Sequence, residues 1–399
     1  MHLTRRASYA AVLMALILAP SADGPAVAQT DAAGIIARVE APQVPNRQGL
    51  DALALTEVMQ KFRVPGVSVA VIKDFKIHWT KAYGIADIER GTPLQIDSLF
   101  QAASISKPVT ALAVMSLVQE GRINLDADVN TLLKSWQVPK SDHTRNGPVT
   151  LRALLSHTSG ADDGFGFPGY DPSESRPTAV QIIEGQKPSN VGRVLFGRPP
   201  FQGYKYSGGG YTIVQSALID LLGQPFADIM RTRVLGPLGM THSSFEQPLP
   251  PAKAGGATRA HSGQGKPMGP PWHVYPELAA AGLWTTPSDL ARFAIEIQSA
   301  AQGREATVLK QPAAREMLSP AGVGPMGVGL RLELRNEGWY FSHGGSNWGF
   351  RANMLAHMRK GYGIVTMTNG DAGQPVINEI EARVAAAYGW DSLDKPLFR

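Results

Sequence analysis

SLFQAASISKPVTALAVMSLVQEG, residues 98–121, joins a short extended run to a strongly amphipathic helical stretch. The residues expected to face inward are Val109, Leu112, Ala113, Leu117 and Val118. Pro108 is tolerated only in a first helical turn, so we expect the helix to begin close to Ser104. Gly121 is the kind of residue that ends a helix. Because residues three apart share a helix face, Ser104 and Lys107 should point the same way.

The pair Ser104 and Lys107 has a possible chemistry. A serine hydroxyl alone is a poor nucleophile, but an adjacent amine can accept its proton if burial lowers the pKa of the amine. The start of a helix also favours developing negative charge. Ser-x-x-Lys is nevertheless a weak signal by itself, because most such sequences are surface helix starts with a capping serine.

Two downstream motifs strengthen this signal. Tyr206-Ser207-Gly208 follows a proline-rich loop and precedes a helical stretch, where the phenol could serve as a second base or proton shuttle. His343-Gly344-Gly345 ends a β-rich run, and its glycines would let a substrate lie along the strand backbone.

β-rich runs lie near both ends of the chain, and the first two are joined by a tight polar turn, as in a hairpin. They are Gly66–Lys73, Lys76–Tyr83, Val328–Leu334, Trp339–His343, Phe350–Met358 and Tyr362–Thr368. Helical patterns flank them at Asn46–Phe62 and Val376–Tyr388.

The economical arrangement of these elements is an α+β fold. One antiparallel sheet, flanked by helices, is built from residues 29–125 and 272–399. A mostly helical region, residues 126–271, is inserted between them.

The composition argues against several kinds of partner and site. Of 399 residues, 43% are hydrophobic and 18% charged, which is typical of a globular protein with a large core. The net charge is +5, but Lys and Arg form no run of four, so we expect no nucleic-acid partner. The absence of cysteine excludes disulfides and thiol nucleophiles, and the nine dispersed histidines argue against zinc. We therefore expect neither a metal nor another cofactor.

The N-terminus predicts export. Arg5 and Arg6 precede an apolar stretch, 10–19, and Ala26-Val27-Ala28 supplies the small residues that signal peptidase reads. We interpret residues 1–28 as a cleaved signal peptide; the alternative is an uncleaved N-terminal anchor. The apolar stretch is too short for a permanent span, so we expect a periplasmic or secreted protein whose mature form has no membrane span.

The three motifs, in this order, resemble those of the serine β-lactamase and penicillin-recognising superfamily. The likeness is greatest to its class C-like branch, which includes family VIII carboxylesterases and D-amino-acid-specific peptidases, and it extends from about residue 47 to the C-terminus. Further similar segments are TLRALLSHTSG (150–160), PLGM (237–240), AGLWTTPSDL (281–290) and MTNG (367–370).

The resemblance implies a role for each motif. Ser104 would attack a carbonyl and become acylated, while Lys107 and Tyr206 would move the proton. Backbone N–H groups of Ser104 and Ser346 would form the oxyanion hole, and water would then release the acyl group.

The departures from the class C pattern also carry information. Gly208 stands where those enzymes have Asn, and His343-Gly344-Gly345 stand where they have Lys-Thr-Gly. The missing lysine removes a fixed cation for a substrate carboxylate, and His343 would replace that charge only if protonated. Both changes fit an esterase or peptidase better than a β-lactamase.

We therefore expect an exported serine hydrolase that acts on small-molecule esters or amides through a Ser104 acyl-enzyme. A class C-like β-lactamase or D-Ala-type peptidase is the alternative within this chemistry. The alternative outside it is a non-catalytic relative that binds cell-wall peptides, which should have lost Ser104, Lys107 or Tyr206.

Other residues near the motifs have two interpretations. His157 is more typical of a structural role than of chemistry, and Tyr204 of packing or of a rim. Ser106 either caps the helix or lies near the site. Trp348 lines the substrate site or belongs to the core, and the aromatic- and glycine-rich stretch 164–201 is a substrate-shaping wall or an ordinary loop.

Overall fold

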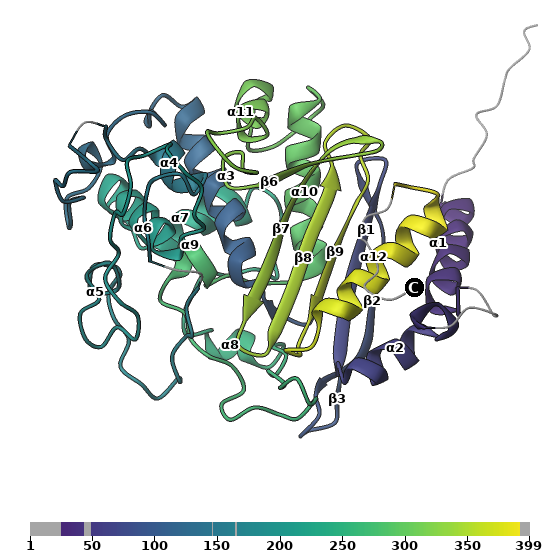
Figure 1. Ribbon diagram of the computed structural model, residues 1–399. Helices are drawn as coiled ribbons and strands as arrows, with labels where there is room; N and C mark the ends of the chain where they lie inside the picture. Colours follow the sequence, from purple (N-terminus) through teal and green to yellow (C-terminus); the bar gives the residue numbers. More distant parts are fainter. Residues whose placement is uncertain (1–24, 44–48, 146, 164–165, 392–399) are drawn as a thin grey trace, which may run out of the picture.

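A seven-stranded antiparallel sheet forms the centre of the protein (Figure 1). The computed structural model describes residues 25–43, 49–145, 147–163 and 166–391. The strand order is β3-β2-β1-β9-β8-β7-β6. The strands are β1 (Gly66–Lys73), β2 (Lys76–Asp87), β3 (Thr92–Pro93), β6 (Arg331–Arg335), β7 (Gly338–Asn347), β8 (Phe350–His357) and β9 (Gly363–Thr368). The predicted α+β fold, with one sheet built from both ends of the chain, is confirmed.

The two ends of the chain meet in the middle of this sheet. β1 pairs antiparallel with β9, and Val67 lies opposite Thr368. Seven of the eight residues of β1 are buried. A strand that is covered on both faces is expected to be apolar at nearly every position, which explains the run GVSVAVI.

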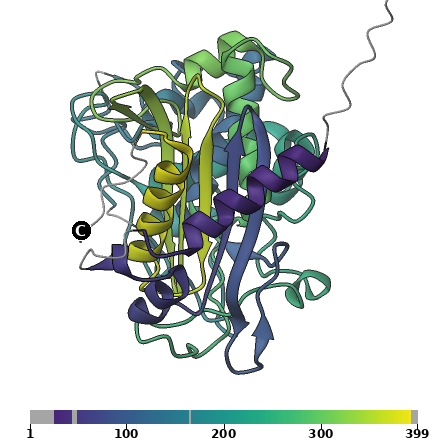
Figure 2. The ribbon, with the colours of Figure 1, turned by 90° about the vertical axis from the view of Figure 1, so that its right-hand side faces the viewer.

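Three helices cover one face of the sheet: α1 (Pro25–Glu40), α2 (Leu55–Phe62) and α12 (Gln374–Tyr388) (Figures 1 and 2). The helix predicted over 46–62 is shorter than expected. Leu53 and Ala54 have extended backbones, so a 3₁₀ turn, η1 (Leu50–Ala52), is separated from α2. Helix α1 was not expected from the sequence, and the first 24 residues of the predicted signal peptide lie outside the described residues.

The opposite face is covered by α10 (Pro287–Ala301), which contacts β1, β8 and β9. Beside it lies α3 (Ser106–Gln119), in which every residue from 106 to 117 is buried. The sequence predicted a helix with one inward face, whereas α3 is enclosed on all sides. Gly121 follows its end with a φ of +71°, in agreement with the predicted stop.

Shorter elements complete this side of the molecule. The helices are α4 (Leu151–Leu155), α5 (Ala179–Glu184), α6 (Gly208–Leu222), α7 (Phe226–Met230), α8 (Pro251–Ala254), α9 (Leu278–Ala281) and α11 (Gln311–Met317), and β4 (Phe100–Gln101) pairs with β5 (Trp284–Thr285). Helices α4 to α8 fall within the predicted helical insertion, whose boundaries stay a prediction. Among the described residues, no helix is both long and apolar enough to cross a membrane.

A buried arginine fastens α12 to the N-terminal segment. Arg383 is fully buried, and its Nε donates to Glu379 one turn earlier on the same helix, at 2.8 Å. Its two terminal nitrogens donate to four backbone carbonyls at 2.9–3.3 Å, those of Val39, Ala41, Leu50 and Leu53. A charge out of water is tolerable only when it is paired and hydrogen-bonded in this way.

We expect Arg383→Ala to lower the free energy of unfolding by about 3–5 kcal/mol, because it leaves Glu379 buried without its cation. Urea denaturation followed by circular dichroism measures the loss. Arg145→Ala is the control, since the ion pair of Arg145 within the described residues is with the exposed Asp142, and its loss should cost less than about 1 kcal/mol. Equal losses in the two variants would contradict this account of Arg383.

Candidate active site

The main cavity of the described structure has a volume of about 730 Å³ and opens between the sheet edge at β7 and the helical side. Every residue that the sequence singled out as a site residue lines it. The lining residues are Ser104, Lys107, Gly166, Phe167, Pro168, Tyr204, Tyr206, Ala281, Met326, Arg331, His343, Gly344, Gly345, Ser346, Asn347 and Gln374.

Ser104 and Lys107 are in direct contact. Ser104 lies in a 3₁₀ turn, η2 (Ala103–Ile105), that leads into α3. Lys107 Nζ lies 3.1 Å from Ser104 Oγ and donates to the carbonyl oxygen of Ala280 in α9 at 2.9 Å. The spacing of three residues therefore places both side chains on one face, as predicted.

The backbone before Ser104 is strained and held in place. Ala103 has a φ of +51°, which residues with a side chain rarely adopt. The hydroxyl of Ser106 donates to Ala103 O at 2.6 Å and accepts from Leu283 N–H at 3.0 Å. Ser106 thus ties the turn to the strand end beside it, which explains why a hydroxyl is buried next to Ser104.

Burial sets the charge of Lys107. The side chain is only 2% exposed and forms no ion pair with a carboxylate of the described residues. Burial lowers the pKa of Lys107 to about 7, although the nearby Asp163 acts in the opposite direction. Near neutral pH, a large fraction of the molecules therefore carries a neutral amine beside the Ser104 hydroxyl.

Tyr206 completes the cluster from the segment before α6. Its hydroxyl forms a hydrogen bond with Ser104, and Lys107 Nζ lies 4.9 Å from the centre of its ring. Burial raises the pKa of Tyr206 well above its usual value, so the phenol is protonated at neutral pH. The three polar groups thus lie within one hydrogen-bonded cluster.

The start of α6 explains one departure from the class C pattern. A Cβ at Gly208 would lie 2.6 Å from the ring of Phe167, which is part of the cavity wall. Asp163 fixes the same turn, since it accepts from the Ser207 hydroxyl and, at 2.6 Å, from Gly209 N–H. An asparagine at position 208 would require the wall to move.

Beyond Ser342, no strand in the described part of the chain pairs with the edge of β7 that lies beside Ser104. β6 pairs with β7 only as far as Arg331 opposite Ser342, whereas β8 pairs with it up to Asn347. Since antiparallel residues alternate in the direction of their N–H groups, those of Gly344 and Ser346 point away from β8. A Cβ at Gly345 would lie 2.2 Å from the carbonyl oxygen of Ala102, so only glycine allows this close approach.

His343 is neutral and does not replace the missing lysine. It is 6% exposed, and its Nδ1 lies 2.7 Å from the carbonyl oxygen of Gly344, so Nδ1 must carry the proton. Burial, with a further effect of Lys107, lowers the pKa of His343 to about 3. At neutral pH, His343 therefore supplies no cation at the position of the class C lysine.

Sequence reasoning missed Arg331, which brings a positive charge to the cavity. It lies on β6 opposite Ser342 and is exposed. Its side chain forms no hydrogen bond or ion pair with the described residues. Only the pairing of β6 with β7 places Arg331 beside His343, so no local signal could have identified it.

The structure shows which of the residues with two interpretations line the cavity. Phe167 and Pro168 line the cavity, so part of the stretch 164–201 is a cavity wall; residues 164–165 lie outside the described residues. Tyr204 also lines the cavity. Trp348 is not among the lining residues but stacks on His273, with 4.0 Å between ring centres.

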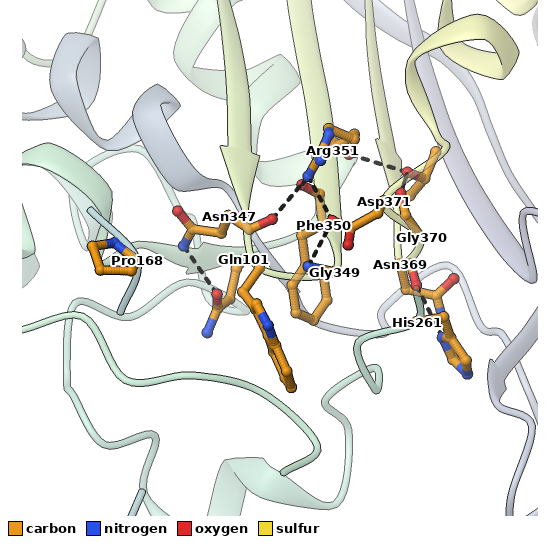
Figure 3. Close-up of polar contacts among 12 residues, drawn as sticks. Gln101, Pro168, His261, Asn347, Gly349, Phe350, Arg351, Asn369, Gly370 and Asp371 are labelled. Atoms are coloured by element: carbon orange, nitrogen blue, oxygen red, sulfur yellow. Dashed lines mark hydrogen bonds and ion pairs between the residues drawn. The ribbon is translucent and has the colours of Figure 1, made fainter. Parts of the chain in front are cut away.

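Polar contacts hold the end of β7 (Figure 3). The Asn347 side chain donates to Gln101 Oε1 at 2.9 Å, and Arg351 donates to the carbonyl oxygen of Asn347 at the same distance. Arg351 also pairs with Asp371, at 3.1 Å, which accepts from Gly349 N–H in the turn between β7 and β8. These contacts fix the strand that faces Ser104.

In the described part of the chain, no three His, Cys, Asp or Glu side chains gather as a metal site would need.

Solved structures share the fold. A D-alanine carboxypeptidase AmpC from Burkholderia cenocepacia superimposes with a TM-score of 0.67 at 19% identity, covering 89% of this chain and 99% of that one. The octameric penicillin-binding protein homologue from Pyrococcus abyssi gives 0.66 at 22% identity, covering 85% and 76%.

Curated relatives are similarly distant. Protein flp of Staphylococcus aureus (strain N315) is 24% identical over 322 residues; the match covers 78% of this chain but only 61% of the staphylococcal protein. Esterase EstB of Burkholderia gladioli is 27% identical over 352 residues, with 80% and 81% covered. The family model described as Beta-lactamase matches residues 52–388, and this chain therefore belongs to the beta-lactamase family, whose members are typically serine hydrolases.

Proposed function

We propose that this protein hydrolyses small carboxylic esters through an acyl-enzyme formed on Ser104. The observation that carries the proposal is the contact of 3.1 Å between Ser104 Oγ and the Nζ of Lys107, an amine whose pKa burial lowers to about 7. Such an amine can accept the serine proton near neutral pH.

In the proposed reaction, Ser104 Oγ attacks the ester carbonyl while Lys107 takes its proton. The oxygen of the carbonyl becomes an oxyanion, which the N–H groups of Ser104 and Ser346 stabilise. The tetrahedral intermediate then expels the alkoxide, which receives a proton through Tyr206. Water then attacks the carbonyl of the acyl-enzyme and gives its proton to Lys107. The Ser104 oxygen leaves and receives a proton through Tyr206, so the products are the carboxylic acid and free Ser104.

Three features favour an ester over a β-lactam. His343 is neutral, so it offers no cation at the position of the class C lysine. Gly208 offers no side-chain amide, and the ring of Phe167 occupies the space beside it. The relative EstB is named an esterase, which supports the same substrate class.

A D-Ala-type peptidase is the second candidate, and Arg331 is the observation that favours it. Such a substrate ends in a carboxylate, which needs a cation in the cavity. Arg331 supplies one from β6 rather than from the motif on β7.

Export to the periplasm or the medium, proposed from the signal-peptide pattern of residues 1–28, would fit either substrate.

A fluorophosphonate probe should add covalently to the wild-type protein and not to Ser104→Ala, and intact-protein mass spectrometry detects the adduct. We expect the variant to lose at least about 10³-fold in p-nitrophenyl ester hydrolysis, because no nucleophile remains. Ser116→Ala, on the same helix α3, is the matched control and should label like wild type. Absence of any Ser104-dependent adduct would instead favour a non-catalytic, peptide-binding protein.

The activity should rise with pH through about 7, since the free amine of Lys107 is the proposed base and is present above its pKa. Below that pH, kcat/KM should fall about tenfold per pH unit. Asp163→Asn removes the charge that holds this pKa up and should move the midpoint to lower pH. A profile that is flat between pH 5.5 and 8.5, after subtraction of spontaneous hydrolysis, would rule Lys107 out as the base.

Arg331→Gln should separate anionic from neutral substrates. For a p-nitrophenyl ester with a carboxylate on its acyl chain, we expect kcat/KM to fall about 10–100-fold, the usual effect of losing a charged hydrogen bond. For p-nitrophenyl butyrate it should not change. Arg335→Gln, on the same strand but outside the cavity lining, is the control. Equal effects on both esters would show that Arg331 does not select the substrate.

A further inference from the structure

His157 lies against the ring of Tyr206. It follows α4 with a φ of +60° and is 1% exposed. The two rings are stacked, with centres 4.2 Å apart and planes 28° from parallel. A residue other than glycine with a positive φ is uncommon, and it is retained where the surroundings demand it.

His157 also holds the backbone on both sides of Tyr206. Its carbonyl oxygen accepts from the N–H of Lys205 at 2.9 Å. Its Nδ1 accepts from the N–H of Ser207 at 3.1 Å. His157 therefore contacts three consecutive residues. Its carbonyl oxygen holds Lys205, its ring stacks on Tyr206, and its Nδ1 holds Ser207. The positive φ of His157 belongs to the conformation in which it makes all three contacts.

The charge state of His157 fits this role. Because Nδ1 accepts, the ring proton must be on Nε2. Burial, with smaller effects of Lys107 and His343, holds the pKa of His157 well below its usual value. The ring thus stays neutral through the pH range in which Lys107 titrates, and it neither supplies nor takes a proton in the reaction. Protonation would cost the Ser207 contact and would put a second cation near Lys107.

We propose that His157 is the positioning residue of Tyr206: its ring and its Nδ1 together fix where the phenol hydroxyl meets Ser104. The inference rests on the proposed function, in which Tyr206 delivers the proton to the leaving group. A hydroxyl that is misplaced by a fraction of its hydrogen-bond length delivers that proton slowly, although the substrate still binds.

Two substitutions separate the contacts of His157. His157→Asn removes the stacked ring, keeps an oxygen that can accept from Ser207 N–H, and tolerates the positive φ. His157→Phe keeps the stacked ring and loses the acceptor. Thermal unfolding of each variant shows whether it is folded before its kinetics are compared.

The test is a double-mutant cycle with Tyr206→Phe, which removes the hydroxyl and keeps the ring. The readout is kcat/KM for ethyl butyrate, which reports acylation, together with KM, and the acid released is followed by titration at constant pH. This ester is chosen because ethoxide leaves only when it is protonated, whereas p-nitrophenoxide leaves without a proton. In the wild-type background we expect His157→Asn to slow acylation about 10–100-fold and to change KM less than about threefold. In the Tyr206→Phe background the same substitution should change acylation less than about twofold, because there is no hydroxyl left to place.

His261→Asn is the matched control. His261 is also fully buried, and its Nδ1 lies 2.9 Å from the carbonyl oxygen of Asn369, at the end of β9 (Figure 3). Its replacement should change acylation less than about twofold, because additivity holds between separate sites.

The outcomes distinguish this inference from the proposed function. An equal loss in both backgrounds, or no loss in the wild-type background, overturns the positioning role while hydrolysis by Ser104 stands. Failure of both His157 variants to fold likewise overturns it, since the role is then one of stability. A wild-type protein with neither hydrolysis nor a Ser104 adduct overturns the proposed function and this inference with it.

Discussion

A buried lysine that forms no ion pair with a carboxylate of the described residues is the constraint around which the site is arranged. The shift of the Lys107 pKa from 10.5 to about 7 corresponds to roughly 5 kcal/mol against the charged form, at about 1.4 kcal/mol per unit. That cost depends on α3 being enclosed on all sides, with Lys107 in its first turn. The rest of the molecule supplies the enclosure: α9 contributes the Ala280 carbonyl, and the loop before α6 contributes the ring of Tyr206.

The same enclosure explains which small residues the site requires. Gly345 lets β7 approach the Ser104 turn, and Gly208 lets the wall at Phe167 close over the start of α6. These glycines allow close packing around the polar cluster. A low pKa for the amine and a shaped cavity are thus two results of one packing arrangement.

The sequence allowed a good prediction wherever its signal was local. The Ser104–Lys107 spacing, the hairpin of β1 and β2, and the sheet drawn from both chain ends were all predicted. The break at Leu53 was not, because it depends on backbone angles within an otherwise helical pattern. The place of Arg331 in the cavity and the contacts of His157 with residues 205–207 were not predicted either. Each depends on the packing of strands or loops that are distant in the chain. The neutral state of His343 required its burial and its hydrogen bond to be known.

The central pairing of β1 with β9 has a consequence for the order of assembly. Val67 finds its partner Thr368 only after nearly the whole chain is available, and α12 is fastened by Arg383 later still. Contacts so distant in sequence form slowly, because a long loop must close before they contribute. During synthesis the nascent chain therefore carries an apolar β1 that is paired with β2 on one edge and unpaired on the edge that later meets β9. A chain that stops before β9 has no completed sheet against which the Ser104 turn can be held.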